Sequence, residues 1–299
     1  MADFDWNDLR AFLAVARTGR LTAAAARLGA DHTTVGRRVS ALEARLGARL
    51  FDRSPQGYAL TAHGERLLPT AEEIESLTLR AAHDLGEADQ AVSGTVRIGA
   101  PEGFGSYFLA PLMVALADRQ PNLQIQLVAI PGVLSLSKRE ADIAVTLSAP
   151  REGRLVTRKL TDYGLSLYAA PAYLDARPPI RTRADMAGHR FIGYIEDLLY
   201  APELDYMQAP DVDIQVGLQS SNLIAQLQAA IAGAGLCVLP DFIATAEPGL
   251  RRVLPDAVHL ERSLWLVTHA DLKSLARIRA VTDTIVNAVK NERARFVGG

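Results

Sequence analysis

The sequence lacks several features that would place it in a well-known class of proteins. Cys237 is the only cysteine, which excludes an internal disulfide framework. It lies in the apolar run LCVLP without a cationic neighbour, which favours a buried structural thiol over a redox sensor. No apolar run reaches the roughly 18 residues that a membrane-spanning helix needs, and we expect neither a signal peptide nor a membrane partner.

Catalytic signatures are also lacking. The six histidines do not have the paired spacing of metal ligands. The HExxH, Walker and GxSxG motifs do not occur. Gly99, Gly103 and Gly105 follow a predicted strand, but their spacing differs from the dinucleotide-binding fingerprint. We therefore predict no catalytic residue, no metal site and no cofactor.

Neither sign of charge is in large excess, since the formal net charge is −2, but the charges are unevenly distributed. Residues 1–60 carry nine arginines and six acidic residues, a net charge of +3. Residues 61–92 carry two basic and seven acidic residues, a net charge of −5, and the remaining 207 residues hold 21 of each sign. A basic N-terminal part followed by an acidic segment favours nucleic-acid binding at the N-terminus.

Residues 20–61 predict two helices separated by a short turn. The first helix is expected to begin at Thr22, whose hydroxyl can accept a hydrogen bond from an unpaired N–H, and to end at Gly29. Asp31 is expected to cap the second helix, over residues 32–46, where a carboxylate also suits the positive end of the helix dipole.

The second helix has an apolar and a polar face. Valines and leucines at positions 35, 39, 42 and 46 form one buried stripe. In a helix-turn-helix the opposite face enters the major groove, where arginine can bind guanine edges and threonine can contact bases or phosphates. That face carries Thr33, Thr34, Arg37 and Arg38. The alternative is that the two arginines only solvate a surface helix.

Flanking segments complete a winged helix-turn-helix. Apolar residues from Trp6 to Ala16 recur at helical spacing before Gly19, which predicts a third helix. Residues 51–60 predict two short extended arms around a turn at Pro55 and Gly57. Such a wing would bring Arg53 and Gln56 close to phosphates.

These segments resemble a known family. The order of LTAAAARLG, TTVGRRVSALEARLG and LFDRSPQGYALTAHGE is similar to the DNA-binding end of LysR-type transcriptional regulators. SGTVRIGAPEGFGSYFLAPLM, KREADIAVTLS and AAIAGAGLCVLP look like parts of that family's effector domain. The resemblance covers nearly the whole chain and is strongest over residues 6–66. Many members open the recognition helix with serine and glutamine, whereas this chain has Asp31 and His32, so the family's base preference is not carried over to it.

The resemblance implies an α+β and α/β chain with three parts. They are a winged helix-turn-helix over residues 1–61, a linker helix over 62–92 that forms dimers, and an effector domain over 93–299. Expected partners are double-stranded DNA, a small-molecule effector, a second copy of the chain in a dimer or a dimer of dimers, and RNA polymerase; the expected location is the cytoplasm. The expected DNA contacts are Thr22, His32, Thr33, Thr34, Arg37, Arg38, Arg53 and Gln56.

The acidic segment carries a heptad pattern. Its members step alternately by four and three residues, which suits packing against another helix, and two-fold symmetry then predicts an interrupted palindromic operator. The alternative is that the stripe packs on its own chain. Pro69 removes a backbone hydrogen bond, so we expect a kink or an irregular first turn there. The stripe consists of Leu67, Ala71, Ile74, Thr78, Ala81, Leu85 and Ala88.

From residue 93 onward, predicted strands alternate with helices, which indicates parallel sheets with crossover helices. Strands are expected over 96–100, 125–128, 141–145, 165–169, 191–194, 213–218, 236–239 and 265–268, and helices over 106–118 and 221–232. The resemblance divides them into two Rossmann-like subdomains, similar to periplasmic binding proteins. Subdomain I comprises 93–162 and 266–299, and subdomain II comprises 163–265.

Ligands of such folds bind where loops leave the carboxyl ends of strands. The expected effector-binding residues are Pro101, Glu102, Gly103, Phe104, Thr146, Ser148, Tyr194, Ser220, Ser221 and Asn222. The alternatives are structural, since serine and asparagine cap helices, Tyr194 can be a core aromatic and Gly103 can simply permit a turn. An ionised Glu102 would repel an anion, so we expect an uncharged, cationic or hydroxyl-rich effector, or one whose carboxylate is held elsewhere.

Two rival functions remain open at this point. One is a cytoplasmic solute-binding or enzymatic αβ protein with an N-terminal helical domain. The other is a DNA-binding regulator whose cleft binds nothing.

Overall fold

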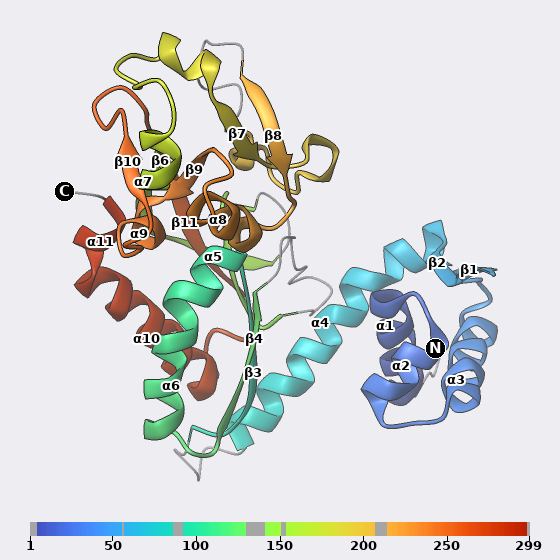
Figure 1. Ribbon diagram of the computed structural model, residues 1–299. Helices are drawn as coiled ribbons and strands as arrows, with labels where there is room; N and C mark the ends of the chain where they lie inside the picture. The colour runs from blue at the N-terminus through green and yellow to red at the C-terminus, as the bar shows by residue number, and fades with distance from the viewer. Residues whose placement is uncertain are drawn as a thin grey trace. The chain divides into compact units, whose positions relative to one another are not determined.

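The computed structural model describes residues 5–55, 57–85, 92–129, 141–150, 154–206 and 214–297. The chain folds into two compact units, residues 1–90 and 91–299. Both units are drawn in Figure 1. Among the described helices, none is both long enough and apolar enough to cross a bilayer.

The N-terminal unit is a winged helix-turn-helix followed by a long helix. Three short helices pack on one another, and the wing is an antiparallel hairpin in which Ser54 faces Gly57. Tyr58 of the wing donates its N–H to the Gly19 carbonyl at 2.8 Å, which ties the hairpin to the end of the first helix. The elements are α1 Trp6–Thr18, α2 Leu21–Leu28, α3 His32–Leu46, β1 Phe51–Ser54, β2 Gly57–Leu60 and α4 Ala62–Leu85.

The helix ends follow the predicted signals, with one exception. Glycines in the left-handed region end α1, α2 and α3, at Gly19, Gly29 and Gly47. The prediction that α2 begins at Thr22 with a hydroxyl cap is wrong. The helix begins at Leu21 after Arg20, which makes no side-chain cap. Leu21 packs against the core of the unit, and this contact extends the helix by one residue.

One apolar core joins all four helices and the wing. Val35, Val39 and Leu42 of α3 are buried with Leu9 and Phe12 of α1, as the stripe predicted. Leu46, the fourth member of the stripe, is only half-buried against this core. A buried ion pair also joins α1 to α4. The Arg17 guanidinium, only 5% exposed, donates to both carboxylate oxygens of Glu75 at 2.6 and 3.2 Å.

Helix α4 runs without interruption across Pro69, so the expected irregularity does not break the helix. Its heptad stripe is divided between two roles. Ala71 is fully buried in the core of its own unit, and Leu67 and Ile74 pack against that core. The alternative of packing on the same chain therefore holds for these three positions. Thr78 and Ala81 are exposed, whereas Ala88 and the side chain of Leu85 lie outside the described part.

In the described part of the second unit, nine strands form one continuous sheet. Its order is β4-β3-β5-β11-β6-β9-β7-β8, and β10 pairs with β6. Parallel strands β3, β4 and β5 belong to a first lobe, and parallel strands β7, β8 and β9 to a second. The strands are β3 Gly94–Ala100, β4 Leu123–Ala129, β5 Ile143–Thr146, β6 Leu155–Ala169, β7 Arg190–Gly193, β8 Gln215–Gln219, β9 Leu236–Pro240, β10 Arg251–Val253 and β11 His259–His269.

Two long antiparallel strands, β6 and β11, cross from one lobe to the other. Their register shifts between Leu264 and Trp265, close to the expected subdomain boundary. The sequence predicted only the last third of β6 and the second half of β11. Most residues in the remaining parts are exposed or half-buried, so these parts lack the continuous apolar run of a buried strand. Asp213, the expected start of β8, lies outside the described part.

Helices cover the faces of this sheet (Figure 1). A continuous helical stretch runs from Glu102 through α6, so it begins four residues earlier than predicted. Helix α10 packs against α6 and β3 in the first lobe, and α8 packs against β7 and β9 in the second. The helices are α5 Glu102–Phe104, α6 Ala110–Arg119, α7 Pro171–Asp175, α8 Leu223–Ile231, α9 Asp241–Ala244, α10 Ala276–Asn291 and α11 Arg293–Val297.

Candidate functional sites

The start of α3 is organised by the predicted cap. The Asp31 carboxylate accepts the backbone N–H of Thr33 at 2.8 Å and the Thr33 hydroxyl at 2.5 Å. The hydroxyl contact is the main reason that the pKa of Asp31 lies below its usual value. His32, Thr33 and Arg37 are exposed and Thr34 is half-buried, so this turn presents polar groups to the solvent.

Arg38 is placed differently from its neighbour Arg37. Its guanidinium lies 3.6 Å from the carboxylate of Asp8, which also binds Arg45 at 3.4 Å. The Asp8 side chain is only 8% exposed, so it holds the two arginines against α1. Arg38 therefore has a structural partner that the helical pattern did not indicate.

The wing is fixed by Glu43 of α3. One oxygen of its carboxylate accepts the N–H groups of Leu50 and Phe51 at 2.8 and 3.3 Å. The other accepts Arg53 at 2.9 Å, and the Arg53 guanidinium also lies over the ring of Tyr58. Arg53 is thus at the surface but already paired, and Gln56 lies outside the described residues.

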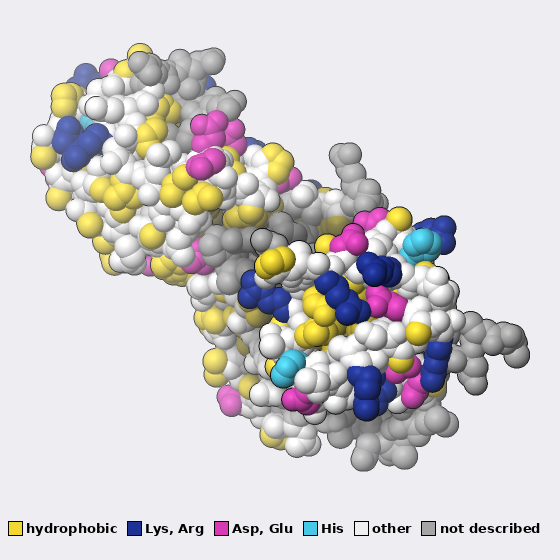
Figure 2. Space-filling view, turned by 90° about the vertical axis from the view of Figure 1, so that its right-hand side faces the viewer, with side chains coloured by type: hydrophobic (Ala, Val, Ile, Leu, Met, Phe, Trp, Pro, Cys, Tyr) yellow, Lys and Arg dark blue, Asp and Glu magenta, His cyan; other side chains and the backbone are white. Residues whose placement is uncertain are grey.

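Figure 2 shows the side of this unit that carries α3 and the wing. Arginine side chains are spread across that face among uncharged groups and some acidic ones. Arg37 of α3 and Thr22 of α2 are both exposed. The geometry suits a surface that meets phosphates and base edges.

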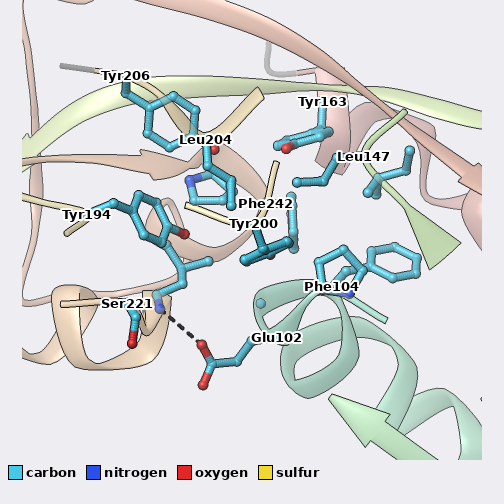
Figure 3. A pocket seen from close by; sticks show the side chains of 15 residues that line it. Glu102, Phe104, Leu147, Tyr163, Tyr194, Tyr200, Leu204, Tyr206, Ser221 and Phe242 are labelled. Carbon is cyan, nitrogen blue, oxygen red and sulfur yellow. Dashed lines mark hydrogen bonds between the residues drawn. The ribbon is translucent and has the colours of Figure 1, made fainter. Parts of the chain in front are cut away.

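The second unit contains an aromatic cavity close to the junction of its lobes (Figure 3). Tyrosines from several segments converge on it, and its volume is about 30 Å³. A cavity of this size holds about two ordered waters. A larger effector therefore requires the lining to move. The cavity is lined by Pro101, Glu102, Gly103, Phe104, Leu147, Tyr163, Tyr194, Tyr200, Leu204, Tyr206, Ser221, Leu223, Pro240, Phe242 and Leu264.

Burial keeps the tyrosines of this cavity protonated. Desolvation is the main cause of the rise in the pKa of Tyr200 to about 12, and the negative charge of Glu102 adds to it. The pKa values of Tyr163, Tyr194 and Tyr206 are also raised, mainly by burial. The cavity thus offers neutral phenol groups and aromatic faces.

The structure brings most of the predicted effector residues together. Those that line the aromatic cavity are Pro101, Glu102, Gly103, Phe104, Tyr194 and Ser221. Thr146 and Ser148 line an adjoining hollow of about 240 Å³, which shares Pro101, Leu147 and Tyr200 with the cavity. The sequence reasoning missed Tyr163, Tyr200, Tyr206 and Phe242, because no local pattern marks aromatic residues that meet only in the fold.

The polar residues among them also have structural roles. Asn222 caps α8 by accepting the N–H of Ala225 at 2.7 Å, and the Ser220 hydroxyl accepts the N–H of Asn222 at 3.1 Å. The Thr146 hydroxyl donates to the Ser148 carbonyl at 2.7 Å. The structural alternative of a helix cap is therefore realised for Asn222, whereas Ser220 only binds the N–H of that cap residue. Tyr194 is 8% exposed.

Glu102 makes the closest polar link between the two lobes in this region. Its Oε2 accepts the backbone N–H of Leu223 at 3.0 Å, and its Oε1 accepts the side-chain amide of Asn222. Figure 3 marks the first of these bonds with a dashed line. Gly103 permits the approach, since a Cβ there would lie 2.6 Å from the Leu223 side chain.

Cys237 is fully buried, and burial raises the pKa of its thiol, which agrees with the predicted structural role. Within the described ranges, no group of three or more potential ligands is arranged to hold a metal ion.

Two family models match the chain. The LysR substrate binding domain matches residues 89–290, and the bacterial regulatory helix-turn-helix protein of the lysR family matches residues 6–65. The chain belongs to the LysR family of transcriptional regulators. It therefore joins a DNA-binding helix-turn-helix to an effector-binding domain, and the alternative of a solute-binding or enzymatic protein is not favoured.

Similar proteins agree with this assignment. The transcriptional regulator PtxR of Pseudomonas aeruginosa is 30% identical over 256 residues, which cover 83% of this chain and 81% of PtxR. The transcriptional activator TtdR of Escherichia coli is 27% identical over 290 residues, covering 93% and 91%. The structure of ArgP from Mycobacterium tuberculosis shares the fold, with a TM-score of 0.71, 22% identity and coverage of 96% and 97%.

Full-length LysG from Corynebacterium glutamicum, solved with bound effector Arg, also shares the fold. Its TM-score is 0.65 at 20% identity, and the match covers 96% of this chain and 99% of LysG. LysR regulators bind DNA and small-molecule effectors and form oligomers.

Proposed function

We propose that this regulator reads duplex DNA with the exposed face of α3. In this proposal Arg37 binds a guanine edge, and His32, Thr33 and Thr34 contact neighbouring bases or phosphates. The observation that carries it is the exposed guanidinium of Arg37 on a helix whose start is held by Asp31. Thr22, Arg38, Arg53 and Gln56 would contribute phosphate contacts, with Arg38 and Arg53 remaining close to their acidic partners.

Two copies would bind an interrupted palindrome. The exposed positions Thr78 and Ala81 continue the heptad pattern of α4 beyond the part buried in its own unit, so this end of α4 is the proposed dimer contact. The proposal further includes assembly into a dimer of dimers, contact with RNA polymerase, a cytoplasmic location and the lack of catalytic activity. The proposed division of the effector domain is residues 93–162 and 266–299 against 163–265.

The proposed effector is a small molecule that enters the aromatic cavity and the adjoining hollow. Four tyrosines and the carboxylate of Glu102 favour an uncharged, hydroxyl-rich or cationic compound over a simple anion. Because the aromatic cavity itself has a volume of only about 30 Å³, an effector that reaches into it from the adjoining hollow would displace lining residues and so change how the lobes pack. That change would alter the spacing of the paired α3 helices and thereby DNA bending.

The DNA proposal is tested by selecting binding sites from a random duplex library with the full chain. We expect interrupted palindromes, protected from nuclease at both half-sites, with affinity that falls steeply as salt rises. Recovery of no preferred sequence would contradict it.

The effector proposal is tested by a melting-temperature screen of small molecules. A tightly bound simple carboxylate in contact with Glu102 would overturn the expected ligand class.

A further inference from the structure

The Glu102 carboxylate connects two segments that are 120 residues apart in the sequence. Glu102 begins α5, directly after β3 of the first lobe, whereas Asn222 and Leu223 begin α8 of the second lobe. Both carboxylate oxygens accept hydrogen bonds from this helix start, one from the Asn222 side chain and one from the Leu223 N–H at 3.0 Å. The link is therefore bidentate and joins the two lobes.

The start of α8 is a place where a negative charge is stabilised. This helix has nine residues, and its first N–H groups point away from the helix with a partial positive charge. Asn222 accepts the N–H of Ala225, and Ser220 accepts the N–H of Asn222, but both are uncharged. Among the described residues that bind this helix end, Glu102 brings a full negative charge.

The surroundings fit a carboxylate that is held in place. Gly103 lies so close to Leu223 that a side chain there would collide with it, and Phe104 is buried beneath. These contacts fix the backbone beside Glu102 at hydrogen-bond distance from α8. The negative charge of Glu102 is also felt by Tyr194 and Tyr200, whose pKa values it raises further.

We propose that Glu102 is a built-in anion that occupies the start of α8 and links the two lobes without any external ligand. The chain then needs no effector carboxylate at this position, and an effector acts by strengthening or breaking the Glu102 link. This last consequence rests on the effector binding proposed above, whereas the assignment of Glu102 does not.

The proposal predicts that a small external anion can replace the missing carboxylate. Glu102→Ala removes both acceptors and leaves space where acetate fits. In the full-length variant we expect the amide of Leu223 to exchange with deuterium about tenfold faster than in the wild type, since a hydrogen bond to a charged group is lost. The melting temperature of the second unit should fall as well.

Sodium acetate should reverse both changes in Glu102→Ala in a saturable manner, while sodium chloride at equal ionic strength should not. The wild type should not respond, because its own carboxylate fills the position. The matched control is Asp118→Ala, which removes an exposed carboxylate from α6 in the same lobe and should show no acetate response. If acetate changes the exchange rate and melting temperature of wild type or Asp118→Ala as much as those of Glu102→Ala, the proposal is wrong. It is also wrong if Glu102→Ala folds and acetate changes neither quantity.

If Glu102→Ala does not fold, Glu102→Asp decides the question. Aspartate keeps the charge but is one methylene shorter, so its oxygens no longer reach the Leu223 N–H. Faster exchange at Leu223 supports the direct link, and unchanged exchange overturns it. Operator binding is measured separately, so a failure of the acetate test leaves the DNA-binding proposal intact, and a failure to find an operator leaves the Glu102 assignment intact.

Discussion

Helices α3 and α8 begin in similar ways but depend on different parts of the chain. Asp31 caps α3 from two residues before the N–H that it accepts, and the cap remains exposed. Asn222 caps α8 locally as well, but Glu102 adds a second acceptor from 121 residues before Leu223. One helix start is open to an external partner, and the other is already occupied by the chain.

This difference matches the proposed tasks of the two helices. A recognition helix has to offer its first turns to DNA, so a small local cap that leaves its outer face free is suitable. A helix at the contact between two lobes is expected to respond to a change in how the lobes pack. A side chain from the opposite lobe makes the hydrogen bonds at its start depend on that packing. Four predictions test the local organisation of α3 and its wing against this long-range organisation.

The largest effect is expected from Arg37→Ala on operator binding. Arg37 is exposed on α3, so its loss should leave stability unchanged while weakening operator binding by about 1–3 kcal/mol if it contacts guanine. Discrimination should be lost at one base pair of each half-site. The measurement is titration of the selected operator and of its single base-pair variants at fixed salt.

The matched control for this variant is Arg10→Ala, which removes an exposed arginine from α1 of the same unit. It lowers the net charge equally but should change only general, salt-dependent affinity. If both variants weaken binding to every sequence by the same factor, Arg37 contributes charge alone and the assignment to a base is wrong.

The second prediction concerns Glu43, which holds the wing. Glu43→Ala leaves the N–H of buried Leu50 without its acceptor, so the free energy of unfolding of the N-terminal unit should fall by about 2 kcal/mol. Glu43→Gln keeps that acceptor and loses only the charge that binds Arg53, so it should cost less than about 1 kcal/mol. Urea unfolding, followed by Trp6 fluorescence in a Trp265→Phe background, measures both. Equal losses would mean that the Arg53 contact dominates.

The parts of the molecule that could be predicted from the sequence are those that depend on near neighbours. Helix ends at Gly19 and Gly29, the Asp31 cap and the buried stripe of α3 all follow from residues a few positions apart. Contacts made by Glu43, Asp8 and Glu102 depend on partners from 7 to 121 residues away, so periodicity does not indicate them.

The candidate effector site divides in the same way. The loops at the carboxyl ends of strands could be predicted, because the alternation of strands and helices fixes where those ends lie. Tyr163 comes from the middle of β6, and Tyr200 and Tyr206 come from irregular segments, so the aromatic lining emerges only from the fold. The sequence thus predicted the loops that border the cavity but not the tyrosines that line it.

A smaller effect is expected from Arg38→Ala. Because Arg38 pairs with Asp8, its loss should lower the free energy of unfolding of the N-terminal unit by less than about 1 kcal/mol, with Arg45 remaining on Asp8. Base discrimination should be retained, in contrast to Arg37→Ala. Urea unfolding by Trp6 fluorescence and titration of operator variants distinguish the two arginines. Loss of discrimination in Arg38→Ala with stability unchanged would instead show that Arg38 contacts a base edge, as proposed for Arg37.

The smallest effect is expected at the cap of α3 and depends on pH. Contacts with Thr33 lower the pKa of Asp31 below its ordinary value of 3.8. The stabilisation is therefore fully present above that value and is lost as the pH falls through the lower pKa of the folded state. Asp31→Asn keeps a capping oxygen without a titrating group, so the stability difference between wild type and variant should shrink between about pH 5 and pH 2. The stability difference is measured at each pH by unfolding followed by Trp6 fluorescence. Asp5→Asn, at the cap of α1, is the matched comparison and should show the same dependence on pH, because the pKa of Asp5 is also lowered. A difference that stays constant across this range would show that the Asp31 carboxylate is not engaged by Thr33, and that α3 begins without the local charge on which its contrast with α8 depends.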